Sequence, residues 1–240
     1  MDRYIDMHCH ILPGVDDGAQ NLEETRQMLQ IAFNEGTRLI IATPHHHPRR
    51  GHKRPERLNE QLRLVRAEAT KISDKFRIYL GTEVFFGQDV PEKINRGEIL
   101  TMNKRNTVLL EFSPSDSYDY IRQGVQQVQM TGNQVIIAHA ERYQCLLDDI
   151  GYAEELCDMG ASIQVNAGSI IGDGGRRAKK FVKELMDEDM VFGVGTDAHG
   201  VQTRAPKMKK AADYVKKKYG EEYMRRIFFD NAATLLRKRK

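Results

Sequence analysis

The sequence predicts an α/β protein whose parallel strands close into a barrel, and three observations support this prediction. Seven apolar segments alternate with helical segments along the 240 residues. The apolar segments are nearly continuous runs, as expected for parallel strands that are buried on both faces. Histidine or acidic residues stand at the carboxyl ends of most of these segments. A doubly wound open sheet fits the alternation equally well, but a ring gathers side chains from nearly every strand at one end, so the barrel is favoured.

The predicted strands are short and mostly apolar. They cover residues 4–10, 38–43, 77–82, 108–110, 135–138, 162–166 and 191–196. Side chains alternate between the two faces of a strand, so His8 and His10 point the same way at the end of the first strand. Right-handed crossovers place the carboxyl ends of all parallel strands at the same end of the sheet.

The segments between the strands carry helix signals. Asn21 and Glu24 match a capping box at the start of a helix that Gly36 ends. The next helix has an apolar stripe at spacings of four and three residues, formed by Leu58, Leu62, Val65, Ala69 and Ile72. Further helices are predicted over residues 118–128, around residue 156 and around residues 181–185, and basic helices finish the chain.

Composition limits the possible classes of protein. No linker or repeat interrupts the chain, so a single domain over residues 1–240 is predicted. Lys plus Arg number 37 and Asp plus Glu 34, a net charge of +3, which is too balanced to indicate a nucleic-acid partner. The three cysteines include no C-x-x-C pair and indicate a reducing compartment. No apolar run has membrane-spanning length and no signal peptide precedes the first strand, so we expect a cytoplasmic protein without stable membrane insertion.

The strand ends carry the residues on which the functional prediction depends. They are His8, His10, Asp17, His45, Glu83, Glu111, His139, Asp197 and His199. Any one of these side chains alone has an ordinary structural explanation. Gathered in one cleft, so many carboxylates and imidazoles are strongly unfavourable unless cations offset their repulsion and desolvation. The set therefore predicts a multinuclear metal site with nitrogen and oxygen ligands, which suits Mn, Fe or Zn.

Two arginines point to a phosphate substrate. Arg142 follows His139 by three residues and Arg204 follows His199 by five. Guanidinium groups beside a metal cluster suit the peripheral oxygens of a phosphoryl group. Other phosphatase chemistries lack their signatures, because no cysteine has an arginine six residues later and the acidic run at 187–189 precedes its strand instead of ending one. No phosphate-binding G-x-x-x-x-G-K-[ST] loop and no G-x-S-x-G elbow is present either.

These segments together resemble a known family. The matching runs are residues 5–19, 42–45, 139–142, 166–169 and 196–199. In this order they are similar to the PHP-domain protein-tyrosine phosphatases of the CpsB/YwqE type, which act in bacterial capsule and exopolysaccharide synthesis. The resemblance spans essentially the whole chain. It implies a distorted (β/α)7 barrel, similar to a TIM barrel, that holds three divalent metal ions, usually Mn²⁺.

The resemblance also implies how the ligands are shared among the ions. One ion is expected to bind His8, His10, Glu83 and Asp197, a second Glu83, Glu111 and His139, and a third Asp17, His45 and His199. Arg142 and Arg204 match the arginines that contact phosphate. Two positions stay open, because Asp16 adjoins Asp17 and because His46 and His47 follow His45.

The implied activity is metal-assisted hydrolysis of phosphotyrosine, and the implied partner is a bacterial tyrosine autokinase that governs polysaccharide export. No phosphocysteine forms in such a reaction, so chelators are expected to inhibit and thiol alkylation is not. Two alternatives remain. One is a small-molecule phosphomonoesterase of the histidinol-phosphate type, and the other is a non-catalytic PHP module that binds nucleic acid. The full ligand set counts against the second.

Overall fold

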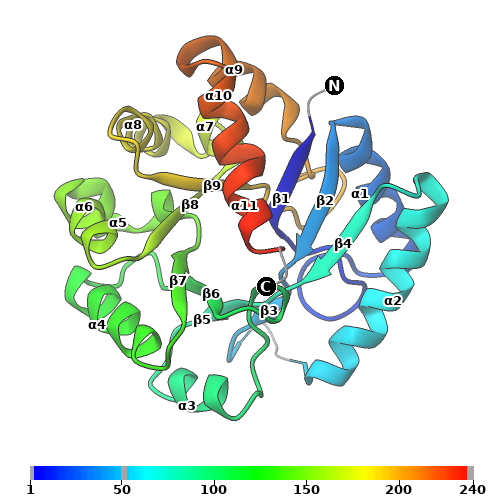
Figure 1. Cartoon of the computed structure of the whole chain (residues 1–240), viewed down its shortest axis with the longest axis horizontal. Coiled ribbons are helices and arrows are strands. Elements are labelled where there is room, and N and C mark those ends of the chain that lie inside the picture. Colours follow the sequence, from blue (N-terminus) through cyan, green and yellow to red (C-terminus); the bar gives the residue numbers. More distant parts are fainter. Residues whose placement is uncertain (1–2, 50–52, 237–240) are drawn as a thin grey trace.

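The strands of the computed structural model, which describes residues 3–49 and 53–236, are all parallel to their neighbours. They are β1 (Tyr4–Cys9), β2 (Thr37–Ala42), β3 (His45–His46), β4 (Arg77–Leu80), β5 (Glu83–Phe85), β6 (Thr107–Glu111), β7 (Gln134–Ile137), β8 (Ser162–Asn166) and β9 (Val191–Gly195). They form one sheet in the order β1-β2-β4 and another in the order β3-β5-β6-β7-β8-β9. Figure 1 shows the strands arranged around a centre with the helices outside them.

Backbone hydrogen bonds join the two sheets into a ring. The ladder between β2 and β4 continues into that between β3 and β5, because the Gly81 amide donates to Ala42 and the Glu83 amide to Pro44. β2 and β3 are therefore two parts of one interrupted strand, and β4 and β5 are two parts of another. On the other side, the Asp197 amide donates to the His8 carbonyl and the His10 amide to Ala198, so the residues after β9 pair with the end of β1. The predicted α/β barrel is confirmed.

The helices lie where the sequence predicts them, with three short additions. They are α1 (Leu22–Asn34), α2 (Pro55–Ile72), α3 (Val90–Asn95), α4 (Tyr118–Gln129), α5 (Gln144–Asp148), α6 (Gly151–Asp158), α7 (Ala167–Ile171), α8 (Gly175–Asp187), α9 (Lys209–Tyr219), α10 (Glu221–Arg225) and α11 (Asn231–Thr234), with 3-10 turns at Met102–Lys104 and Ala140–Arg142 and a π-helical turn at Arg226–Asp230. The predicted N-cap is present, since the Asn21 side chain accepts from the Glu24 amide. The Glu24 carboxylate accepts from the amide of Gln20 instead of that of Asn21, so the reciprocal bond of a capping box is shifted by one residue. The additions α3, α5 and α7 are too short to show a helical period.

The third predicted strand is divided in the structure. Residues 77–82 were expected to form one strand, but β4 ends at Leu80 and β5 begins at Glu83. Gly81 lies in the gap, where an added Cβ would come within 2.6 Å of the Met102 sulfur. The 3-10 turn that contains Met102 packs closely against the chain here, so a larger residue would have to displace the Met102 side chain.

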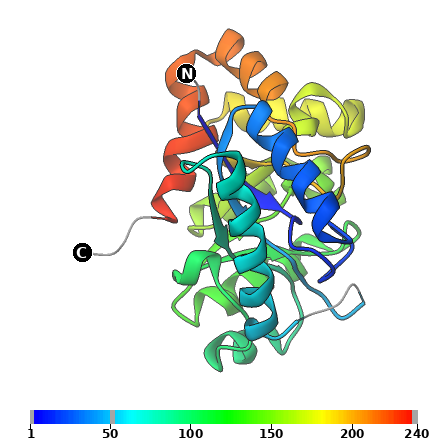
Figure 2. The same ribbon diagram turned by 90° about the vertical axis from the view of Figure 1, so that its right-hand side faces the viewer.

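The core is divided by the barrel wall. Inside the ring, Ile5, Met7, Leu109 and Ile136 pack with Leu235 from the end of the chain. Figure 1 shows the segment from α10 to α11 running over this end of the ring. Figure 2 shows α1 and α2 covering the outer face of the neighbouring strands. Apolar side chains of these helices and strands form a second hydrophobic cluster there. The interior is thus filled at one end, which leaves the carboxyl ends of the strands as the open end.

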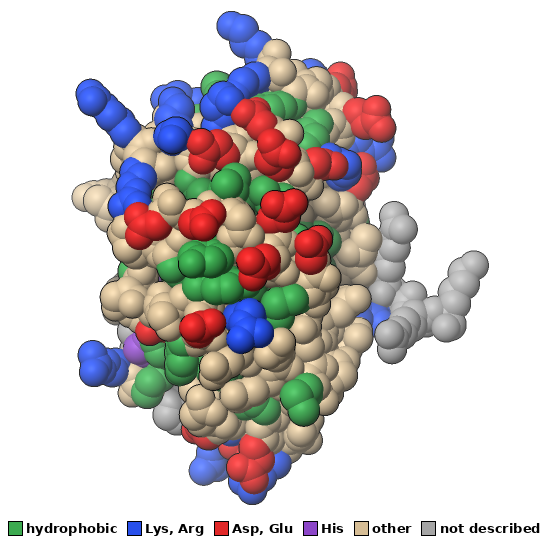
Figure 3. Space-filling model, turned by 90° about the vertical axis from the view of Figure 1, so that its left-hand side faces the viewer, with side chains coloured by type: hydrophobic (Ala, Val, Ile, Leu, Met, Phe, Trp, Pro, Cys, Tyr) green, Lys and Arg blue, Asp and Glu red, His purple; other side chains and the backbone are tan. Residues whose placement is uncertain are grey.

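The outer surface is mixed in charge. Figure 3 shows the face over the helices at the left of Figure 1, where carboxylates alternate with apolar side chains. A groove there is lined by Ile150, Cys157 and Met190 together with carboxylates of α6 and α8. Among the described residues, no helix is both long enough and apolar enough to cross a membrane.

Candidate metal centre

The structure brings all nine strand-end residues to the open end of the barrel. His8 and Glu83 lie within β1 and β5, Glu111 ends β6, and the others lie in the loops after the strands or, for His45, at the start of β3. Three groups of side chains each place their ligand atoms within 4.8 Å of one another. They are His8 with His10 and Asp197, then His10 with Asp17, His45 and His199, and finally His45 with Glu83 and Glu111.

The first group has the spacing of a coordination shell. Nε2 of His8 lies 3.2 Å from Nε2 of His10, and each lies 3.5 Å from Oδ1 of Asp197. Glu83 contributes two more oxygens, at 3.2 Å from His8 and 3.3 Å from His10. Ligands held about 2.1 Å from one ion are about 3.0–3.5 Å apart in octahedral or tetrahedral geometry. The donor atoms therefore fit a shared cation.

The hydrogen bonds of the imidazoles fix which nitrogen faces this space. The Gln164 Oε1 atom accepts from the His139 backbone amide, which can only donate, so Nδ1 of His8 must donate to the same oxygen at 3.0 Å. Nδ1 of His10 likewise donates to Asp16 at 2.8 Å, and Nδ1 of His199 donates to the Asp197 carbonyl at 2.9 Å. The Nε2 lone pairs of all three rings are thereby directed into the cluster.

Buried acceptors that converge on one space favour a bound cation there. Within the described part of the chain, Nε2 of His199 and Oε2 of Glu83 are buried and take part in no hydrogen bond. Unpaired buried acceptors are costly, and converging lone pairs repel one another. The residues present thus fit a bound divalent metal, and their nitrogen and oxygen donors suit Mn, Fe or Zn better than Ca.

The second group places Asp17, not Asp16, among the potential ligands. Oδ1 of Asp17 lies 3.2 Å from Nε2 of His45 and 3.4 Å from Nε2 of His199. The Asp16 carboxylate instead binds the far side of the His10 ring and accepts from the amides of Gly18 and His45. Asp16 therefore orients the His10 ring from the side that faces away from the cluster. His46 lies in none of the three groups, whereas His45 lies in two.

The third group differs in one member from the set implied by the resemblance. Nδ1 of His45 lies 2.8 Å from Oε2 of Glu83, which places His45 between the second and third groups. His139 lies outside these groups, but its Nε2 is 2.8 Å from Glu83 and 3.7 Å from Glu111. Glu83 thus touches four imidazoles, since His8 and His10 also contact it. Such a carboxylate is suited to bridge ions.

Burial keeps two of the imidazoles neutral and therefore able to bind metal. Burial, assisted by the charge of Arg142, lowers the pKa of His139 to about 4. Burial and the neighbouring His10 lower the pKa of His199 to about 3. For His8, burial acts in the same direction, but the carboxylates of Glu83 and Asp197 outweigh it and raise the pKa. The carboxylates thus create a field that attracts positive charge to the first group.

The backbone is strained at three of the site residues. His139, Asp197 and Arg204 have φ values of 32°, 50° and 51°, in the left-handed region that residues with a Cβ rarely adopt. This conformation turns the chain sharply after β7 and β9, so that the side chains point over the end of the barrel. Strain of this kind, costing of order 1–3 kcal/mol per residue, is typical of functional sites.

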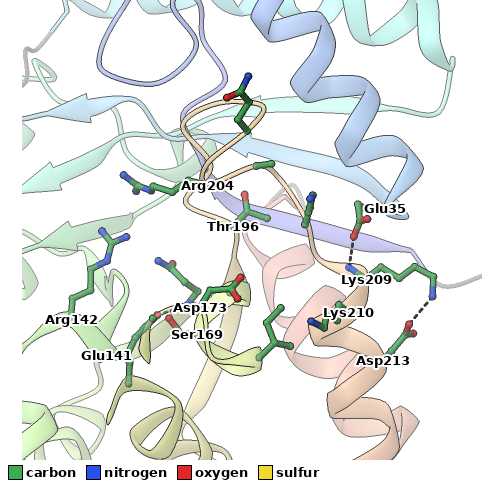
Figure 4. A pocket seen from close by; sticks show the side chains of 18 residues that line it. Glu35, Glu141, Arg142, Ser169, Asp173, Thr196, Arg204, Lys209, Lys210 and Asp213 are labelled. Carbon is green, nitrogen blue, oxygen red and sulfur yellow. Dashed lines mark hydrogen bonds and ion pairs between the residues drawn. The ribbon is translucent and has the colours of Figure 1, made fainter. Parts of the chain in front are cut away.

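The two arginines lie at one side of the cluster, where they bind the same carboxylate. A guanidinium nitrogen of Arg142 is 2.5 Å from Oδ2 of Asp197, and one of Arg204 is 2.6 Å from Oδ1. Both arginines also line a pocket of about 740 Å³ that opens beside the cluster. Figure 4 shows their guanidinium groups on one wall of this pocket. They are therefore exposed to a ligand that reaches Asp197 from the pocket.

Sequence reasoning missed the residues that orient the ligands. Gln164 and Asn166 lie on the same face of β8 and form a chain of hydrogen bonds, from His8 through Gln164 to Asn166 and then to Asp197. Two amide side chains on one face at the end of an apolar strand could have indicated residues that orient the ligands, although amides occur in strands for other reasons as well. The sequence also contains a basic loop at residues 48–54, which we expect to border the cleft, but its residues 50–52 lie outside the described residues.

Comparison with protein families decides the relationship. A family model described as "Capsular polysaccharide synthesis, CpsB/CapC" matches residues 4–237. This chain belongs to the CpsB/CapC family. The resemblance predicted from the sequence is confirmed, and the CpsB/CapC assignment covers the whole barrel and every residue of the candidate metal centre.

Individual CpsB/CapC relatives are similar over their full length. "Tyrosine-protein phosphatase CpsB" of Streptococcus pneumoniae is 32% identical over 237 residues, which are 97% of this chain and 98% of the relative. A solved structure from a set of YwqE from Bacillus subtilis and CpsB from Streptococcus pneumoniae, described as unique metal-dependent tyrosine phosphatases, superposes with a TM-score of 0.89. Its identity is 30%, and the match covers 97% of this chain and 94% of that one.

A more distant structure shares only the fold. It is a histidinol phosphate phosphatase from Lactococcus lactis, solved with zinc, L-histidinol and phosphate, and it superposes with a TM-score of 0.60 at 14% identity. The match covers 91% of this chain and 95% of that one. At this identity the likeness supports the barrel and carries nothing about the substrate of the CpsB/CapC chain.

Proposed function

We propose that this chain is a cytoplasmic phosphatase that hydrolyses phosphotyrosine in proteins and depends on divalent cations. The substrate we propose is a bacterial tyrosine autokinase that regulates capsule or exopolysaccharide synthesis. The relatives named as tyrosine-protein phosphatases support the activity, and the family description supports the connection to capsule synthesis. In this proposal residues 1–240 form one phosphoesterase domain.

The observation that carries the proposal is the convergence of imidazole lone pairs and carboxylates beside two arginines. We propose that His8, His10, Asp17, His45, Glu83, Glu111, His139, Asp197 and His199 hold three cations, Mn²⁺ in preference to Fe or Zn. Bound divalent cations supply Lewis acidity and make water acidic enough to act as a nucleophile near neutral pH. Gln164 and Asp16 orient two of the rings for this purpose.

The arginines act on the phosphoryl group. Arg142 and Arg204 would exchange their contacts with Asp197 for the peripheral oxygens of the phosphate. Negative charge on those oxygens shifts during the reaction, and fixed guanidinium groups stabilise it without reorganising. The leaving phenolate has a pKa of about 10, so a tyrosine ester needs less help from a general acid than an alkyl ester does.

The experiment that tests this proposal measures phosphate release from a phosphotyrosyl peptide with added Mn²⁺ and after thorough chelation. We expect turnover with Mn²⁺ and loss of turnover after chelation. His139→Ala should be inactive or nearly so, because it removes an imidazole 2.8 Å from Glu83. Histidinol phosphate, tested in parallel, distinguishes the small-molecule alternative. Faster turnover of histidinol phosphate than of the peptide would contradict the proposal.

A further inference from the structure

The pocket beside the arginines continues beyond the metal centre to the start of α9 and is lined by basic residues on two sides. Residues 202–210 link Arg204 to the first turn of α9, and this segment contributes Arg204, Lys207, Lys209 and Lys210 to the lining. Figure 4 shows Arg142 and Arg204 on one side of the pocket and Lys209 and Lys210 on the other. The pocket volume of about 740 Å³ is far larger than a phosphoryl group needs.

The lysines of residues 202–210 differ in their partners. Lys209 is held in place, because its Nζ lies 2.6 Å from Asp213 and its backbone amide donates to Glu35. The side chains of Lys207 and Lys210 are exposed, and neither forms an ion pair with any residue that the structure describes. Two uncompensated positive charges therefore border the pocket.

The position of these lysines is unfavourable for the helix itself. α9 has 11 residues, no acidic residue in its first turn and no side-chain cap. Its first turn contains Lys209 and Lys210, although the positive end of the helix dipole lies there and favours carboxylates. Asp213 and Glu35 offset this for Lys209, but nothing described offsets it for Lys210. Basic residues that remain at a helix N-terminus with no carboxylate to offset them are typical of a surface used for binding.

Carboxylates in the pocket lining oppose this charge. Asp173, in the loop after α7, lines the pocket between the two basic sides, and its side chain has no ion-pair partner among the described residues. Glu141 also lines the pocket, but it is buried and accepts a hydrogen bond from the Asn166 amide. Among the described residues, the pocket charges without an ion-pair partner are thus Lys207 and Lys210 against Asp173 and Glu35, and the Glu35 carboxylate accepts from the Lys209 amide.

We propose that this pocket binds acidic side chains that flank the phosphotyrosine of the substrate, and that Lys207 and Lys210 determine the preference for them. The inference rests on the proposed function, because the phosphoryl group at Arg142 and Arg204 is what places the flanking residues in the pocket. Complementary charge at a partly exposed site contributes modestly, so we expect about a two- to fivefold effect on kcat/KM for each lysine.

The test compares two phosphotyrosyl peptides that differ only in having glutamate or glutamine near the phosphotyrosine. With Mn²⁺ present, the unaltered protein should turn over the glutamate peptide with the higher kcat/KM, and added salt should reduce this ratio. Lys207→Ala combined with Lys210→Ala should reduce the ratio to near one. Asp173→Asn should raise it, since it removes the opposing charge.

Two controls separate the pocket from general effects. Lys75→Ala combined with Lys217→Ala removes the same charge at exposed positions outside the pocket lining and should leave the ratio unchanged. Free phosphotyrosine, which has no flanking residues, should be hydrolysed equally by all variants. Equal kcat/KM for the two peptides, or a ratio that the lysine double variant does not alter, would overturn the inference while the phosphatase activity stands. Absence of hydrolysis of every phosphotyrosyl ester would overturn both proposals.

Discussion

The Oε1 atom of Gln164 accepts two hydrogen bonds, and one of them comes from Nδ1 of His8 at 3.0 Å. The other comes from the backbone amide of His139, on the neighbouring strand end. One buried amide therefore sets the ring tautomer of one candidate ligand and the backbone position of another. In the neutral ring Nε2 of His8 then carries the lone pair, so Gln164 orients the ring for a cation before any cation binds.

Replacing this amide should weaken metal binding without abolishing the fold. We predict that Gln164→Leu lowers the affinity for Mn²⁺ by about 10- to 100-fold, because the His8 and His139 contacts are lost. Gln164→Glu should lose less affinity for Mn²⁺, since a carboxylate still accepts the hydrogen bonds from His8 and His139. Isothermal titration of the demetallated proteins measures the effect, and Gln123→Leu, on the exposed face of α4, is the matched control. Unchanged affinity in Gln164→Leu would show that the amide is structural only.

Chelation and thiol chemistry should have opposite consequences. Removal of the metal is expected to abolish phosphotyrosine hydrolysis, and Mn²⁺ should restore it. Alkylation should leave activity intact, because Cys9 is fully buried and burial raises the pKa of its thiol. Phosphate release after dialysis against a chelator, and separately after iodoacetamide, measures both effects. Activity that persists in protein shown by elemental analysis to be free of metal would refute the mechanism.

The arginines should affect turnover more than metal content. We expect Arg142→Ala and Arg204→Ala each to lower kcat by about 10²- to 10³-fold, because each removes a donor to the developing phosphoryl charge. Lysine should replace neither fully, since it lacks the planar pair of donors. Steady-state kinetics with metal analysis of each variant tests this, with Arg177→Ala on the surface of α8 as control. A loss below tenfold at both positions would remove the arginines from the mechanism.

Asp6 should make stability depend on pH. This carboxyl, which accepts hydrogen bonds from the His8 amide and from the amide and hydroxyl of Thr196, joins β1 to the end of β9. Burial raises its pKa to about 6, against about 3.9 in an unfolded chain. The folded protein thus holds this proton more tightly than the unfolded chain does. The stabilisation that this proton gives to the folded protein is complete below about pH 4 and is lost as the pH rises through about 6.

Asp6→Asn should remove that dependence, because the amide reproduces the bonds of the protonated acid and does not ionise. The difference in unfolding free energy between Asp6→Asn and the unaltered protein should change by about 2–3 kcal/mol between pH 4 and pH 7. The variant should become more stable relative to the unaltered protein as the pH rises. Urea unfolding at a fixed Mn²⁺ concentration measures this difference. A difference that stays constant over this range would show that Asp6 is ionised throughout.

Much of the fold could be predicted because its signals are local. The strand order along the chain, the N-cap at Asn21 and the apolar stripe of α2 each depend on neighbours within a few residues. The division of the third strand at Gly81 could not be predicted, because the residue that packs against Gly81 is Met102, which is distant in sequence. The short helices α3, α5 and α7 lack a full helical period and so gave no signal.

By itself, the sequence determined which residues stand at the open end of the barrel, because side-chain alternation and right-handed crossovers fix the strand ends. Only the tertiary structure decided how their atoms meet. It placed Asp17 in the cluster and Asp16 behind His10, brought His45 between two groups, and supplied Gln164 as the shared acceptor. The physical reason is that these contacts depend on ring closure and on left-handed backbone turns at His139 and Asp197, which no local pattern encodes.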